Sequence, residues 1–137
     1  MPLDVERQRV LVIEVEQEMK IFLSNLLATG GFEPVVFEGP IEGLGKFKSA
    51  EPSLIILDAM MPKAEGIQIY RNIKHDETLK HVPIIILSNI DRKSFLYYLK
   101  SQDSFYGQKV PGPNAYLEKP PETEHLLGLV RMLTGKD

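Results

Sequence analysis

The chain has 137 residues, of which 43% are hydrophobic and 26% charged, and this composition is typical of one folded domain. It contains no cysteine, which excludes thiol catalysis, disulfide bonds and cysteine-based metal sites. The formal net charge of −3 argues against direct binding of nucleic acid, because phosphate backbones bind to basic surfaces. The apolar runs are too short to span a membrane and the N-terminus lacks a signal-peptide pattern, so we expect a cytoplasmic protein without a membrane partner.

Short apolar runs alternate with longer amphipathic segments along the chain, which is the pattern of parallel strands joined by helices. Three of the runs are apolar at four consecutive residues, as expected for strands that helices cover on both faces. We therefore predict an α/β fold, with a single (βα)5 domain over residues 1–137 and a core at about 8–134. The five predicted strands are Val10–Ile13, Val35–Phe37, Leu54–Leu57, Ile84–Leu87 and Ala115–Leu117.

Apolar residues at helical spacing predict a helix after each run. The first helix ends at Gly30-Gly31, a pair that tolerates positive φ. The second begins near Pro40 and is short, the third spans about residues 65–74, and the fifth follows Pro120-Pro121.

The fourth helix is predicted over residues 91–102, with Phe95, Tyr98 and Leu99 facing the sheet. The segment that follows contains two glycines and two prolines, which interrupt any regular pattern. The sequence therefore predicts an extended loop at about residues 103–113, just before the fifth strand.

Acidic, hydroxyl or amino side chains follow four of the apolar runs: Glu14 and Glu16, Asp58, Ser88 and Lys119. In an open parallel sheet, ligands bind at the carboxyl ends of the strands, so these side chains should meet at one edge. Carboxylates bind Mg²⁺, an aspartate can attack phosphorus, and an ammonium with a hydroxyl can hold phosphoryl oxygens. The pattern therefore predicts phosphoryl transfer to Asp58.

These residues stand in four motifs that resemble the receiver domain of bacterial response regulators, the phosphoacceptor module of two-component signalling. Glu14 precedes Asp58 by 44 residues and Asp58 precedes Ser88 by 30, as in the family pattern. The resemblance covers nearly the whole chain and implies a flavodoxin-like, doubly wound sheet of five parallel strands in the order 2-1-3-4-5. The motifs are Arg9–Glu14, Leu54–Pro62 with Gly66, Pro83–Ser88 and Ala115–Pro120.

The resemblance also implies a role for each residue of the predicted site. Asp58 would be the phosphoacceptor, and Lys119 would contact the phosphoryl group. Ser88 would be the switch hydroxyl, and Tyr116 would be the aromatic residue that turns inward when Ser88 moves. The bond between Lys119 and Pro120 would be cis, which aims the lysine at the site.

A magnesium site is implied by the same resemblance, formed by Glu14, Asp58 and the backbone carbonyl of Met60. The family usually has two adjacent acidic residues after the first strand, the second a direct Mg²⁺ ligand, whereas here Val15 follows Glu14. We expect weak Mg²⁺ binding, because water has to fill the position that Val15 cannot. Glu16 is either a further ligand that reaches back or a solvated carboxylate that the helix dipole favours.

The implied function is to accept a phosphoryl group on Asp58 from a histidine kinase or phosphotransfer protein. The added charge would switch a surface of the fourth helix, fifth strand and fifth helix toward a downstream protein, an output domain or a second copy of the chain. Such a domain is not an enzyme in its own right. A phosphatase with an aspartate nucleophile is disfavoured, because Met60 occupies the position of its second aspartate.

The sequence leaves one alternative function, a degenerate pseudo-receiver that binds other proteins without phosphorylation and in which Val15 marks a lost metal site. The interval from Ser88 to Lys119 is 31 residues, longer than the family pattern, and the surplus falls in the predicted loop at 103–113. An added loop beside the usual signalling surface suggests an unusual partner. Residues 121–137 hold no output module, so we expect a single-domain regulator or a piece of a longer chain.

Overall fold

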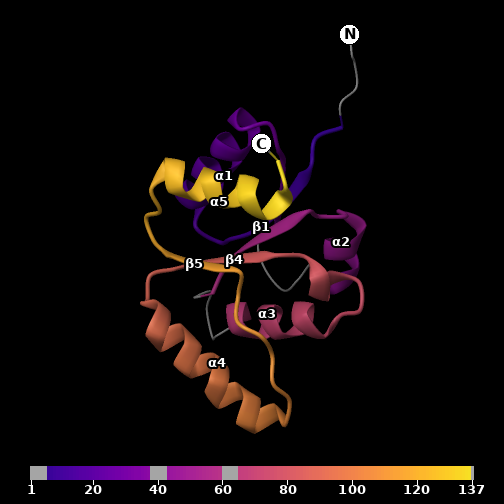
Figure 1. The fold of residues 1–137 in the computed structure, drawn as a ribbon, viewed down its shortest axis with the longest axis vertical. Helices are drawn as coiled ribbons and strands as arrows, with labels where there is room; N and C mark the ends of the chain where they lie inside the picture. The colour runs from indigo at the N-terminus through magenta and orange to yellow at the C-terminus, as the bar shows by residue number, and fades with distance from the viewer. Residues whose placement is uncertain (1–5, 38–42, 60–64, 137) are drawn as a thin grey trace.

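The computed structural model describes residues 6–37, 43–59 and 65–136, which form a five-stranded sheet covered by helices on both faces (Figure 1). All strands are parallel and the order is β2-β1-β3-β4-β5, as predicted. Each predicted strand is present within two residues of its expected bounds. The strands are β1 (Arg9–Ile13), β2 (Glu33–Phe37), β3 (Leu54–Asp58), β4 (Ile84–Ser88) and β5 (Ala115–Glu118).

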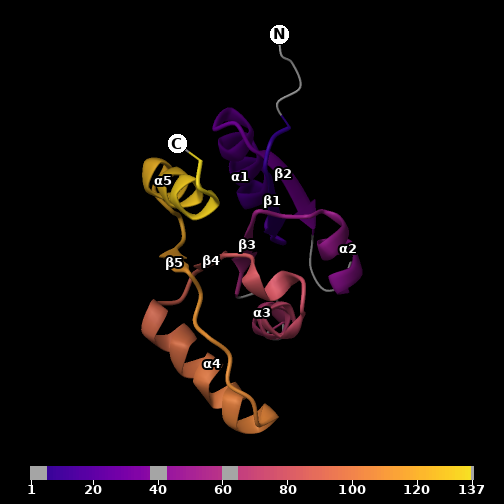
Figure 2. The ribbon, with the colours of Figure 1, turned by 45° about the vertical axis from the view of Figure 1, so that its right-hand side comes forward.

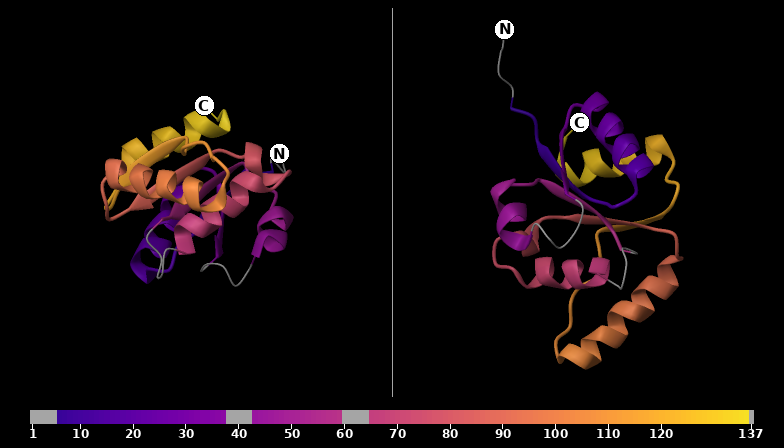
Figure 3. Two further views of the ribbon diagram at one scale, coloured as in Figure 1. Left: turned by 90° about the horizontal axis from the view of Figure 1, so that it is seen from below. Right: turned by 180° about the vertical axis from the view of Figure 1, so that it is seen from behind.

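Helices α1 and α5 cover one face of the sheet, and α2, α3 and α4 lie on the other (Figures 1 and 3). A 3-10 turn, η2, was not expected from the sequence and connects α3 to β4. The predicted start of the second helix at Pro40 lies outside the described residues. The bounds are α1 (Gln17–Thr29), α2 (Gly43–Ser49), α3 (Glu65–His75), η2 (Leu79–His81), α4 (Arg92–Tyr106) and α5 (Thr123–Thr134).

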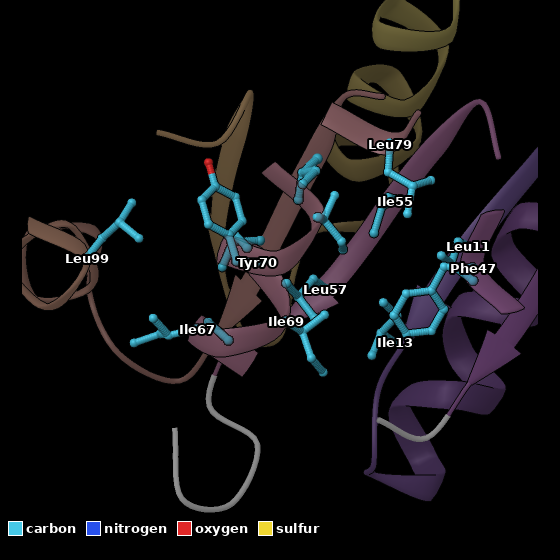
Figure 4. Packing of buried hydrophobic residues seen from close by; sticks show 14 of the residues in the cluster. Leu11, Ile13, Phe47, Ile55, Leu57, Ile67, Ile69, Tyr70, Leu79 and Leu99 are labelled. Atoms are coloured by element: carbon cyan, nitrogen blue, oxygen red, sulfur yellow. The ribbon is translucent and has the colours of Figure 1, made fainter. Parts of the chain in front are cut away.

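The sheet divides the core into two layers, because successive side chains of a strand point to opposite faces. In β1, Leu11 and Ile13 pack toward α2 and α3, whereas Val10 and Val12 pack toward α1 and α5. Figure 4 shows the first of these layers, in which Phe47 of α2 lies beside the β1 side chains. Helices bury both faces of the sheet, which explains why residues 10–13 of β1, 54–57 of β3 and 84–87 of β4 are all apolar.

Helix α1 ends at the predicted glycine pair, and the two glycines serve different purposes. Gly31 adopts a φ of 94°, which L side chains rarely reach. Gly30 has ordinary backbone angles, but a Cβ atom there would lie 2.7 Å from Leu127 Cδ1 of α5. The pair therefore turns the chain and also lets α1 and α5 approach closely.

Helix α4 is longer than predicted, so the expected loop from residue 103 was wrong for its first four residues. The helix continues to Tyr106 and ends at Gly107, which adopts a left-handed conformation with φ 70°. Its last turn is fastened to α3 by the buried Arg71, whose guanidinium lies 2.8 Å from both the Asp103 carboxylate and the Gln108 carbonyl. Figure 2 shows α4 reaching past α3 and the chain running back alongside it to β5.

The inward face of α4 also differs from the prediction at one residue. Phe95 and Leu99 are buried as expected, but Tyr98 is 52% exposed. The helix is turned so that Leu96, rather than Tyr98, flanks the buried stripe and packs against the core. A Cβ atom on Gly112 of the returning segment would lie 3.8 Å from Leu96 Cδ2. A leucine side chain has no polar atom to satisfy, which favours it over tyrosine in this contact.

We expect Asp103→Asn to lower the free energy of unfolding by about 1–3 kcal/mol, because the buried Arg71 guanidinium would lose its anionic partner. Urea denaturation followed by circular dichroism measures the change. The matched control is Glu77→Gln, which removes a carboxylate from the exposed ion pair with Lys80 and should change stability by less than about 0.5 kcal/mol. Equal effects of the two substitutions would show that Asp103 does not fasten the end of α4.

Candidate functional site

Polar side chains gather where the carboxyl ends of four neighbouring strands meet, as predicted. Glu14 follows β1, Asp58 ends β3, Ser88 ends β4, and Lys119 follows β5. Glu14, Asp58 and Ser88 are buried, whereas most charged side chains of a small domain lie on its surface. The parallel register brings them together, because Asp58 pairs with Leu87 of β4 and Ser88 pairs with Glu118 of β5.

The Lys119 ammonium is the centre of this cluster. Its Nζ atom lies 2.6 Å from Glu16 Oε1, 2.9 Å from Glu14 Oε1 and 3.1 Å from Asp58 Oδ2. The peptide bond between Lys119 and Pro120 is cis, as the resemblance implied. Three carboxylates from two different strand ends thus surround one buried ammonium.

The cluster carries more negative than positive charge, and this determines its electrostatics. Burial lowers the pKa of Lys119, but the carboxylates of Glu16, Glu14 and Asp58 raise it by more, so the pKa lies above its usual range and the lysine stays charged. Burial, reinforced by the Asp58 carboxyl and opposed by Lys119, raises the pKa of Glu14 to about 7. A second cation would relieve the remaining repulsion.

Glu14 and Glu16 are held by the backbone at the start of α1. Glu14 Oε2 accepts hydrogen bonds from the backbone N–H groups of Val15 at 3.0 Å and Glu16 at 3.1 Å. Glu16 is the N-cap residue of α1, yet its side chain makes no capping hydrogen bond and extends to Lys119. The sequence left open whether the Glu16 side chain reaches back to the site or extends into solvent. In the structure its carboxylate reaches back to Lys119.

The donor set fits a magnesium ion. Carboxylate oxygens of Glu14, Glu16 and Asp58 lie within 4.8 Å of one another, and hard oxygen ligands are those that Mg²⁺ prefers. Glu14 Oε1 is buried and accepts no hydrogen bond among the described residues, although it lies 2.9 Å from the ammonium. Val15 contributes no donor, and Met60, whose carbonyl is the other predicted ligand, lies outside the described residues.

Ser88 and Tyr116 both contact the segment that leads from β4 into α4. Ser88 Oγ accepts a hydrogen bond from the backbone N–H of Ile90 at 3.1 Å, and the Tyr116 hydroxyl donates to the carbonyl of Ile90 at 2.5 Å. The Tyr116 ring packs on Phe95 of α4, with the ring centroids 5.3 Å apart. A continuous set of contacts thus joins the site to α4.

Gly66 lies in the first turn of α3, directly against the end of β3. A Cβ atom on this residue would lie 2.5 Å from the carbonyl oxygen of Asp58 and 2.4 Å from that of Ala59. Both distances are shorter than a carbon–oxygen contact allows, so only glycine fits. The presence of Gly66 in the third-strand motif is therefore explained by the close approach of α3 to the end of β3.

A surface hollow of about 470 Å³ opens beside Lys119. Four residues of its lining were not singled out by sequence reasoning: Gln17, Glu18, Met19 and Asn89. Asn89 directly follows β4, and the other three lie in the first turn of α1. Their place at the edge of the sheet where the strands end is the signal that would have found them.

Comparison with known proteins decides the family. The sequence model of the family described as the response regulator receiver domain matches residues 10–131. The chain belongs to this family. It is 30% identical over 129 residues to "Hybrid signal transduction histidine kinase D" of Dictyostelium discoideum and 25% identical over 126 residues to "Polar-differentiation response regulator DivK" of Brucella ovis. These matches cover 93% and 92% of the chain, which spans 8% of the length of the kinase and 94% of DivK.

Solved receiver structures have the same fold. A sensor protein of a Polaromonas species superposes with a TM-score of 0.79 at 20% identity, covering 95% of this chain and 98% of that one. The receiver domain of a Pseudomonas aeruginosa sensor histidine kinase, crystallised with a magnesium ion in its active site cleft, gives 0.76 at 20% identity, covering 96% and 100%. The flavodoxin-like fold implied by the resemblance is therefore confirmed.

Receiver domains are signalling modules that bind Mg²⁺ at an acidic cluster and interact with histidine kinases or phosphotransfer proteins and with downstream partners. The chain has such a cluster in Glu14, Glu16 and Asp58. Among the described residues, none of the helices combines the length and the apolar composition that crossing a membrane requires.

Proposed function

We propose that the chain accepts a phosphoryl group on Asp58 from a phosphohistidine of a histidine kinase or phosphotransfer protein. The observation that carries the proposal is the buried Asp58 carboxylate at the end of β3, with its Oδ2 atom 3.1 Å from Lys119 Nζ. A buried aspartate beside a charged lysine joins a nucleophile to a group that stabilises phosphoryl oxygens.

In the transfer step, a carboxylate oxygen of Asp58 attacks phosphorus while the bond from phosphorus to the donor nitrogen breaks and the imidazole keeps the electron pair. The Lys119 ammonium is already in place to bind the phosphoryl oxygens, so little reorganisation is needed as charge moves to the site. Mg²⁺ held by Glu14 and Asp58, with the predicted Met60 carbonyl, would neutralise charge on the carboxylate and the phosphoryl group.

The aspartyl phosphate would act as a switch through its added charge, about −1.5 to −2 at neutral pH. We propose that Ser88 turns its hydroxyl toward the phosphate, which breaks its hydrogen bond with the N–H of Ile90. Ile90 also accepts the hydrogen bond of Tyr116, whose ring rests on Phe95 of α4. A change at Asp58 would therefore alter the surface of α4, β5 and α5 that a downstream protein, an output domain or a second copy contacts.

The proposal is tested by the intact mass of the protein after incubation with an acyl phosphate, with Mg²⁺ or with a chelator. We expect a gain of one phosphoryl mass that requires Mg²⁺ and is lost in Asp58→Asn. The matched control is Asp91→Asn, because Asp91 caps α4 near the same sheet edge and asparagine caps equally well. If wild type gains no mass at any Mg²⁺ concentration, the proposal fails and the alternative of an interaction module without phosphorylation is favoured.

A further inference from the structure

The family position that normally supplies a direct Mg²⁺ ligand is occupied by Val15, whose side chain is 40% exposed and has no donor atom. The next residue, Glu16, extends its carboxylate into the site, with Oε1 2.6 Å from Lys119 Nζ. Its backbone has the extended angles of an N-cap residue, φ −75° and ψ 121°, but its side chain makes no capping hydrogen bond. The Glu16 carboxylate is thus directed at the cluster and not at the helix.

A second feature of the cluster favours a further cation. Glu14 is 1% exposed, with its Oε2 atom satisfied by two backbone N–H groups and its Oε1 atom 2.9 Å from the Lys119 ammonium. The same ammonium also contacts the carboxylates of Glu16 and Asp58. Among the described residues of the cluster, three carboxylates thus share one ammonium, and carboxylate oxygens of all three lie within 4.8 Å of one another.

We propose that Glu16 supplies the carboxylate that position 15 lacks and is a direct ligand of the divalent cation, exchanging its contact with Lys119 for the ion. The inference rests on the proposed function in that the cation assists phosphoryl transfer to Asp58. It assigns a ligand that the family pattern does not provide, since Glu16 stands one residue beyond the usual position.

The exchange is feasible because the ion pair of Glu16 with Lys119 contributes little to the stability of the fold. The Glu16 side chain is 53% exposed, and an ion pair with one partner in water contributes little to stability. Lys119 keeps two other carboxylates, those of Glu14 at 2.9 Å and Asp58 at 3.1 Å, when Glu16 leaves.

The geometry requires only a small adjustment. Neighbouring ligand oxygens around Mg²⁺ lie about 3 Å apart in an octahedral shell, and opposite ones about 4 Å. The oxygens of Glu14, Glu16 and Asp58 already lie within 4.8 Å of one another. Glu16 has three rotatable side-chain bonds, which let its carboxylate move within the cluster while the backbone stays in place.

The test is the affinity for Mn²⁺, a substitute for Mg²⁺ whose free form is measured directly by electron paramagnetic resonance. We expect Glu16→Gln to weaken Mn²⁺ binding at least tenfold relative to wild type. The matched control is Glu124→Gln, because Glu124 is an exposed carboxylate in the first turn of α5 and lies outside the cluster; it should stay within twofold. Thermal unfolding confirms that both variants are folded.

A rescue variant separates a ligand from a residue that only holds Lys119. Adding Val15→Asp to Glu16→Gln restores a carboxylate at the usual family position, and we expect Mn²⁺ affinity to return to within threefold of wild type. Affinity that is unchanged or tighter in Glu16→Gln overturns the inference, because Glu16 would then serve Lys119 alone. Absence of Mn²⁺ binding by wild type overturns it as well.

The ligand role of Glu16 and phosphoryl transfer to Asp58 can fail independently, because one experiment measures metal binding and the other measures the phosphoryl adduct. A wild-type adduct on Asp58 together with unchanged Mn²⁺ affinity in Glu16→Gln would contradict the ligand assignment alone. Glu16-dependent Mn²⁺ binding without any adduct would contradict phosphoryl transfer alone.

Discussion

Replacing Glu14 by glutamine should raise the free energy of unfolding by about 1–3 kcal/mol at pH 8 in the absence of divalent cations, and change it little at pH 4. The pKa of this carboxyl is about 7 in the folded state against an ordinary value of 4.5. Between these values the folded state binds more protons than the unfolded state, so the stability of wild type falls as the pH rises from about 4.5 to 7. Glutamine resembles the protonated acid and removes this penalty.

Urea denaturation at the two pH values, with a chelator present, measures the effect of Glu14→Gln. The control is Glu18→Gln, which removes an exposed carboxylate from the first turn of α1 and should change stability by less than about 0.5 kcal/mol at both pH values. Saturating Mg²⁺ should reverse the order, because only wild type then gains the binding energy of the ion. A Glu14→Gln variant that is less stable than wild type at pH 8 without metal would contradict the charge balance inferred for the site.

Lys119→Met should slow phosphorylation of Asp58 about 100-fold, because it removes an ammonium that contacts the Asp58 carboxylate. The same substitution should tighten Mn²⁺ binding, since a competing cation leaves the three carboxylates. Time courses of intact mass give the rate, and paramagnetic resonance of free Mn²⁺ gives the affinity. Lys93→Met removes an exposed ammonium from α4 and should change neither quantity. Loss of Mn²⁺ affinity in Lys119→Met would mean that the lysine organises the carboxylates instead of competing with the ion.

The strands and the sheet edge where they end could be predicted because they follow from patterns of consecutive residues in the sequence. Burial on both faces makes β3 and β4 apolar at every residue but the last, and that last residue is Asp58 or Ser88. Parallel strands then bring these ends together without any further information. The positions of the polar residues relative to the apolar runs were therefore enough to predict the site.

The end of α4 could not be predicted because it depends on contacts between distant residues. Arg71 and Asp103 are 32 residues apart in sequence, and nothing in the spacing of either segment shows that they meet. Once the pair forms, the helix extends to the next residue that readily adopts a left-handed conformation, Gly107. The exposure of Tyr98 likewise depends on tertiary packing, since Leu96 and not Tyr98 packs against the core beside the buried residues of α4.

The direction of the Glu16 side chain was likewise beyond sequence reasoning. A glutamate at a helix start is equally consistent with solvent exposure and with an inward contact. The choice is made by Lys119, which arrives from 103 residues further along the chain. The same holds for Tyr116, whose hydroxyl partner is a backbone carbonyl that no side-chain pattern can indicate.

Locating the phosphoryl group on the chain tests most directly whether Asp58 is the phosphoacceptor. After reaction with an acyl phosphate and Mg²⁺, borohydride reduces an aspartyl phosphate to homoserine with release of phosphate, and tandem mass spectrometry of the peptides identifies the changed residue. We predict homoserine at position 58 and nowhere else. A phosphoryl adduct on the intact chain that yields an unmodified Asp58 would contradict this prediction.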